Sequence, residues 1–277
     1  MGLRIATNVP SISAQRTLSI NTKDQAESLN KLSSGSRITK AADDAAGLAI
    51  SEKLKAHIRG VNQAERNAND GISMIQTAEG GLNEVSNILV RLRELAVQSA
   101  SDTVGDTERK FTDMEYQNLK QEIERISQVT EFNGKKLLNG AGENFDFQVG
   151  INNNQFEDRI QYNSAATNAT LQGMSITEIT AGSKLGAQEA LGVLDKAIEH
   201  VSGQRAELGA VQNRLASTIQ NLQVSSENLN SANSRIRDTD FAAETAKNTK
   251  LSILTTAGTA VLAQANASGQ GALKLIS

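Results

Sequence analysis

Apolar residues recur every three or four positions through the stretch from Ile50 to Ala96. Their mean step is about 3.5 residues, which is the spacing of a left-handed coiled coil. Asp43 and Asp44 come just before this stretch, where carboxylates favour a helix N-terminus. The pattern predicts one long helix over residues 45–100 that packs along another long helix.

The partner helix is predicted near the other end of the chain. Apolar positions there follow the same seven-residue frame, while Arg205, Thr218 and Ser225 occupy three of the remaining seam positions, and polar seam residues help to fix register. A third, shorter pattern predicts a helix whose apolar face carries Phe111, Met114, Leu119, Ile123 and Ile126. We therefore expect a mainly α fold, an elongated antiparallel coiled-coil rod with helices at about 45–100, 106–129 and 185–232.

A different pattern separates the predicted helix at 106–129 from the one at 185–232. Phe145, Phe147 and Val149 alternate with polar residues, which is the period of a half-buried strand. The Asn-rich run at 152–155 predicts a turn, and a second extended segment passes through Ile160. We expect a small β-hairpin region at about 135–180.

The two ends of the chain carry thinner apolar stripes among Ser, Thr, Asn and Ala. Each stripe is too weak to hold an isolated helix, which needs packing for most of its stability. We predict an inner terminal coiled-coil domain from residues 1–44 plus 233–277, and an outer rod domain from residues 45–232. The terminal segments are expected to be mobile in the monomer and to order on assembly. The predicted assembly seams are Leu29, Leu32, Leu251, Leu254 and Val261.

Composition supports long helices and excludes several classes of protein. The chain has one proline, no cysteine, no tryptophan and only 3% aromatic residues, so disulfides and thiol chemistry are absent. We expect no membrane partner, because no apolar run is long enough to span a bilayer and the N-terminus lacks a signal-peptide core. Residues 1–42 and 233–277 are net basic, but their charges are scattered singly without interleaved aromatics, so we expect no nucleic-acid partner.

The sequence gives no support to catalysis. Its two histidines, His57 and His200, lie far apart within helical patterns. Zinc-protease, phosphate-loop and dinucleotide motifs are absent. We expect neither an enzyme nor a bound cofactor or metal.

Several long motifs, in order along the chain, resemble the signatures of bacterial flagellins. The amino-terminal signature is matched by AQRTL at 14–18, LNKLSSGSRI at 29–38 and ADDAAGLAIS at 42–51. The family's turn before its hairpin is matched by TEFNGKKLL at 130–138. The carboxy-terminal signature is matched by SRIRDTDFA at 234–242 and AGTAVLAQAN at 257–266. The variable outer domains of many flagellins have no counterpart, so the resemblance is to a minimal flagellin.

This resemblance implies a structural subunit that polymerises into the extracellular flagellar filament and serves motility. It further implies export of the unfolded chain through the flagellar type III apparatus. The implied partners are further copies of the chain, an export chaperone that holds the carboxy-terminal segment, and the filament cap and hook–filament junction proteins.

The resemblance also implies recognition by Toll-like receptor 5. Residues 89–98 are similar to the segment through which many flagellins engage that receptor, and Arg91, Leu95 and Glu115 match the central contact positions. A simpler interpretation is that Arg91 and Glu115 pair across two helices or form subunit contacts. We expect both roles together.

Two other interpretations stay open on the sequence alone. A hook–filament junction protein, or another axial protein of the flagellum, shares the terminal helices. A secreted coiled-coil effector that never polymerises is a third possibility. Elongation of short filament seeds separates these classes.

Overall fold

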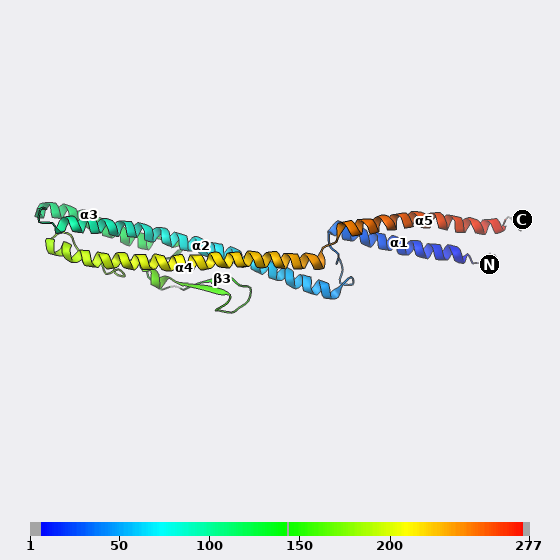
Figure 1. The fold of residues 1–277 in the computed structure, drawn as a ribbon, viewed down its shortest axis with the longest axis horizontal. Coiled ribbons are helices and arrows are strands. Elements are labelled where there is room, and N and C mark those ends of the chain that lie inside the picture. Colours follow the sequence, from blue (N-terminus) through cyan, green and yellow to red (C-terminus); the bar gives the residue numbers. More distant parts are fainter. Residues whose placement is uncertain (1–6, 143, 274–277) are drawn as a thin grey trace. The chain divides into compact units, whose positions relative to one another are not determined.

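The computed structural model describes residues 7–142 and 144–273, and Figure 1 shows its elements. Contacts divide the chain into a terminal unit, residues 1–56 with 228–277, and a central unit, residues 57–227. The outermost residues of the predicted inner domain, 1–6 and 274–277, lie outside the described residues. The helices are α1 (Val9–Ser34), α2 (Ala45–Ala100), α3 (Asp106–Val129), α4 (Lys184–Arg237) and α5 (Phe241–Leu273), with a short 3-10 helix η1 (Ser164–Thr167).

The predicted fold class is confirmed: the protein is mainly α, with long helices and two small antiparallel strand pairs. Helix α2 begins where expected because the Asp44 carboxylate accepts a hydrogen bond from the Gly47 amide at 2.8 Å, a side-chain cap. Helix α4 continues to Arg237, beyond the predicted end at residue 232.

The β region contains two separate hairpins. Strands β1 (Glu131–Phe132) and β2 (Lys135–Lys136) are joined by Asn133 and Gly134, whose φ angles of 51° and 77° suit a tight two-residue turn. Strands β3 (Asn144–Gln148) and β4 (Arg159–Asn163) form the predicted longer hairpin, in which Phe145 pairs with Tyr162. The rest of the predicted region, from residue 164 onward, is η1 and turns.

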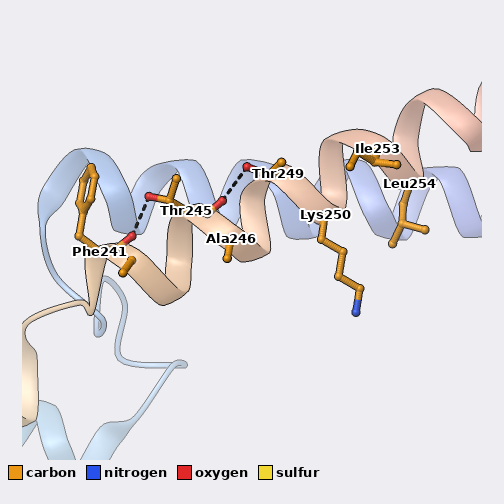
Figure 2. Close-up of a pocket in the computed structure, with 8 residues that line it drawn as sticks. Phe241, Thr245, Ala246, Thr249, Lys250, Ile253 and Leu254 are labelled. Atoms are coloured by element: carbon orange, nitrogen blue, oxygen red, sulfur yellow. Dashed lines mark hydrogen bonds between the residues drawn. The ribbon is translucent and has the colours of Figure 1, made fainter.

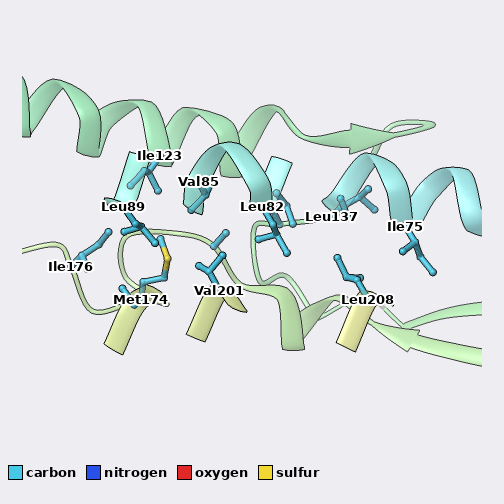
Figure 3. Packing of buried hydrophobic residues seen from close by; sticks show 14 of the residues in the cluster. Ile75, Leu82, Val85, Leu89, Ile123, Leu137, Met174, Ile176, Val201 and Leu208 are labelled. Atoms are coloured by element: carbon cyan, nitrogen blue, oxygen red, sulfur yellow. The ribbon is translucent and has the colours of Figure 1, made fainter. Parts of the chain in front are cut away.

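The core of the central unit lies between α2, α3, α4 and the segments that follow the hairpins (Figure 3). Leu82, Leu89, Val201 and Leu208 are fully buried and come from two helices that are remote in sequence. Full burial of each such side chain contributes about 1.5–3 kcal/mol. This core is what holds α2 and α4 together.

The buried face of α3 differs from the prediction. Ile123 is buried as expected, but Phe111 and Met114 are 67% and 64% exposed. Two long cations take part of the buried face instead. Arg109 donates to the carbonyl groups of Ser99 and Ser101, closing the C-terminal end of α2, and Lys120 donates to two carbonyl groups of the segment 177–179. These two polar side chains therefore fill part of the buried face that the prediction had assigned to Phe111 and Met114.

The terminal unit is built on the antiparallel pairing of α1 with α5. Asn8 donates to the carbonyl of Ala265, while Ser28, at the other end of α1, donates to the carbonyl of Glu244. A short bridge precedes α5, where the Arg37 amide donates to the carbonyl of Arg237 at 2.6 Å. Among the described residues of this unit, few large side chains are buried.

Candidate assembly surfaces

One face of α5 carries an open apolar groove of about 770 Å³ (Figure 2). Phe241 and Ile253 line it and are 66% and 64% exposed. The hydroxyls of Thr245 and Thr249 donate to carbonyl groups of their own helix, so their donor protons are not available to a partner. Apart from Lys250, the groove therefore offers mainly hydrocarbon to whatever covers it.

A second groove, of about 420 Å³, lies between α1 and α5. Pro10, Ala14 and Thr17 line it from α1, and Leu254 and Val261 from α5. Small side chains on both helices make this groove shallow. The two helices of the terminal unit thus leave apolar surface uncovered along their shared length.

The structure places the five predicted seam residues in different surroundings. Leu251 is 8% exposed, in the buried part of the terminal unit, whereas Leu254 and Val261 are 40% and 58% exposed along the second groove. Leu29 is half-exposed and Leu32 is partly buried on α1.

Sequence reasoning missed Phe241 and Ile253 as surface anchors. The spacing of four residues between 241, 245, 249 and 253 was the available signal, because such positions share one face of a helix. The groove became apparent only with the structure.

Glu244 of α5 lies near Ser28 and Lys31 of α1 and beside Lys247 of its own helix. Hydrogen bonding from Ser28 and the nearby charges of Lys247 and Lys31 hold the pKa of Glu244 below its ordinary value. The Lys247 Nζ lies 3.5 Å from a Glu244 carboxylate oxygen. An ionised glutamate is therefore favoured at this interface.

Arg91 links α2 to α3 on the surface of the central unit. Its Nε and Nη2 donate to Glu115 Oε1 at 3.0 and 2.9 Å, and its Nη1 donates to Glu94. These hydrogen bonds, first to Glu94 and then to Glu115, raise the pKa of Arg91. Leu95, the third predicted contact residue, is only 2% exposed and belongs to the core.

The described residues, 7–142 and 144–273, show no cluster of acidic residues, histidines or cysteines able to hold a metal ion. Within the same residues, no helix is both long and apolar enough to cross a membrane. His57 and His200 both lie on helices, in α2 and α4.

Comparison with known proteins gives the family. The bacterial flagellin N-terminal helical region matches residues 5–143, and the C-terminal helical region matches residues 191–276. The chain belongs to the bacterial flagellin family. A flagellin of Halalkalibacterium halodurans is 46% identical over 271 residues, which cover 97% of this chain and 98% of that relative. The flagellar filament core protein flaB2 of Brachyspira hyodysenteriae is 44% identical, covering 98% of this chain and 99% of its own.

Among solved structures, one from Vibrio parahaemolyticus described as a flagellar hook-associated protein matches 71% of this flagellin and all of that chain, with a TM-score of 0.59 and 14% identity. That likeness shows the shared fold alone. The sequence relatives reported above are a flagellin and a flagellar filament core protein. The chain is a structural subunit of the extracellular flagellar filament that serves motility, and it is not an enzyme.

Proposed function

We propose that this flagellin is exported unfolded through the flagellar type III apparatus and then polymerises through the grooved faces of α1 and α5. The observation that carries the proposal is the uncovered apolar surface of the terminal unit, where Phe241, Ile253 and Val261 are each more than half exposed. Contiguous apolar surface of this kind is characteristic of sites that bind other proteins. In a filament, neighbouring copies cover it.

The same surface accounts for the proposed partners. An export chaperone covers the α5 faces before assembly, because a free monomer with these grooves would associate prematurely. The filament cap places each arriving copy at the growing end, and the hook–filament junction proteins offer the first copies a terminal surface of similar architecture. We further propose that α1 and α5 gain most of their order on assembly, since the pair buries few large side chains.

Seeded elongation tests the polymerisation surface. Purified monomers are added to short filament seeds, and growth is followed by negative-stain microscopy. Ile253→Asp places a charge in the α5 groove and is expected to stop elongation. Ser252→Asp, at an exposed neighbouring position outside the groove, is the matched control and should elongate seeds. Equal elongation by both variants would contradict the proposal.

We also propose that monomers engage Toll-like receptor 5 through the surface centred on Arg91 and Glu115. Both side chains are about half exposed and already fixed by their mutual hydrogen bonds, and ordered arginines are frequent interface anchors. Leu95 supports this surface from the core beneath it. The same surface serves subunit contacts in the filament.

A receptor-reporter assay with monomers separates this role from general stability. Arg91→Ala is expected to lower signalling. Arg93→Ala is the matched control because Arg93 is equally exposed on α2 and pairs with Asp195 instead. Leu95→Ala is avoided because it would open a cavity in the core. Signalling by Arg91→Ala equal to that of the control would refute the receptor proposal.

A further inference from the structure

The loop between β3 and β4 presents an exposed phenylalanine from a rigid frame. The Phe156 side chain is 93% exposed. The buried Asp158 carboxylate accepts hydrogen bonds from the amides of Asn152 at 3.3 Å and Asn154 at 2.9 Å. The Asn154 side chain in turn accepts a hydrogen bond from the Phe156 amide at 3.1 Å. The loop is thus ordered before any partner arrives, which lowers the entropy lost on binding.

Two arginines share a surface hollow with the Phe156 ring. The ring borders this hollow of about 330 Å³, whose other walls include Arg159, Arg214 and Glu157. Arg159 is held by Gln148, whose side-chain oxygen lies 3.1 Å from its Nε. Within residues 7–142 and 144–273, no ion pair or side-chain hydrogen bond engages the guanidinium of Arg214. An exposed aromatic ring beside a free arginine is the composition of an interface anchor.

A face of α3 has the complementary composition. Phe111 and Met114, one turn apart on the same helix face, are 67% and 64% exposed. Glu108 and Glu115 stand three positions before and four positions after Phe111, so acidic groups flank the apolar pair. We call Glu108, Phe111 and Met114 the α3 face.

Within one copy the loop and the α3 face cannot meet. Helix α3 begins just after the end of α2 at Ala100, whereas the hairpin packs against the earlier part of α2, where a Cβ on Gly71 would lie 2.9 Å from Phe147. The intervening residues of α2 span roughly 40 Å at the helical rise per residue. Figure 1 shows the start of α3 at one end of the central unit and β3 well along α4 from that end.

We propose that Phe156 of one copy docks on the α3 face of a second copy, with Arg214 opposite Glu108. Contact between two different faces is heterologous, and such a contact extends into an open array when the rotation between copies does not close, as in a filament. The central unit carries 23 acidic and 15 basic residues, and close approach of two such units needs a local cation facing an acidic group. The inference rests on the proposed polymerisation and names one of its contacts.

Disulfide cross-linking tests the contact directly, because the natural chain has no cysteine. A double variant, Phe156→Cys with Met114→Cys, is assembled on seeds and oxidised. Head-to-tail docking brings the two thiols of neighbouring copies together, so a ladder of covalent oligomers is expected in denaturing gels. The matched control, Phe156→Cys with Val129→Cys, places the second thiol at an exposed α3 position outside the face and should give no ladder.

The outcomes separate this inference from the proposed function. Filaments that form but give no ladder overturn the contact and leave polymerisation standing, whereas seeds that the natural chain fails to extend refute the proposed function itself. A dimer from Phe156→Cys alone would show a symmetric contact and also overturn the inference.

A charge-reversal pair provides a second readout in case the double variant fails to assemble. Arg214→Glu and Glu108→Arg are each expected to slow seed elongation roughly tenfold, because each places like charges opposite one another across the contact. The combined variant is expected to restore elongation. Single variants that elongate like the natural chain, or a combined variant that stays slow, would refute the pairing.

Discussion

Two adjacent glycines in α2 predict opposite effects of the same substitution. A Cβ on Gly81 would lie 2.7 Å from Leu138 Cδ1 and 2.8 Å from Thr130 Oγ1, whereas a Cβ on Gly80 would meet nothing within 4 Å. Neither neighbour of Gly81 can move aside freely. Leu138 is fully buried, and the Thr130 hydroxyl donates to the carbonyl of Ile126 at 2.8 Å.

The balance of two terms sets the sign at each position. Replacing a glycine inside a helix by alanine stabilises the folded state by about 0.5–1 kcal/mol. At Gly80 nothing opposes this gain, so Gly80→Ala is expected to raise the free energy of unfolding by that amount. At Gly81 the added methyl overpacks the contact with the β1–β2 region, at a cost of about 1–3 kcal/mol. Gly81→Ala is therefore expected to be less stable than Gly80→Ala by about 1–3 kcal/mol.

Tyrosine fluorescence during urea denaturation measures this difference in the relevant unit. The chain has two tyrosines and no tryptophan, and both Tyr116 and Tyr162 are buried in the central unit. The transition midpoint should shift up for Gly80→Ala and down for Gly81→Ala at an unchanged denaturant slope. Equal stabilisation of both variants would show that α2 and the β1–β2 region are not packed at this distance.

Two further predictions concern Asp43 and Lys120. Hydrogen bonds from the backbone amides of Thr39 and Lys40 lower the pKa of Asp43, so its stabilisation of this loop is present above the ordinary value of about 3.9 and disappears as the pH falls through the lower folded-state pKa. An NMR titration that follows the Thr39 amide should therefore have its midpoint below about pH 3.9, the ordinary pKa of an aspartate. A midpoint at or above that pH would refute the assignment. Lys120→Met leaves two carbonyl groups without their donor and should lower the unfolding free energy of the central unit by about 1–3 kcal/mol. Lys196→Met, at an exposed position, serves as control. Equal denaturation midpoints of the two variants would contradict a stabilising role of the Lys120 hydrogen bonds.

The sequence predicted the long helices well because their apolar spacing is regular and no proline interrupts it. The bounds 45–100 and 106–129 agree with α2 and α3. The longer hairpin was also predicted, since Phe145 and Ile160 follow the strand period and both are buried in paired strands.

The sequence failed where burial depends on polar partners rather than on hydrophobicity. Arg109 and Lys120 are buried because carbonyl groups from other segments accept their hydrogen bonds, and periodicity contains no information on those carbonyls. Phe111 and Met114 were consequently assigned to the wrong face of α3. The extent of the groove around Phe241 could not be predicted either, because it depends on which side of α5 is turned toward α1.

The pairing of α1 with α5 also bears on the order in which the parts of the molecule fold. The two helices are separated by roughly 200 residues of chain, whereas the core of the central unit joins segments that are closer in sequence. Closing the larger loop costs more chain entropy, which disfavours early formation of the α1–α5 contact. The groove that Leu254 and Val261 line together with α1 forms only in a chain that contains an intact α5. A copy truncated before α5 lacks this surface, so polymerisation through it, as proposed above, would exclude truncated chains from the filament.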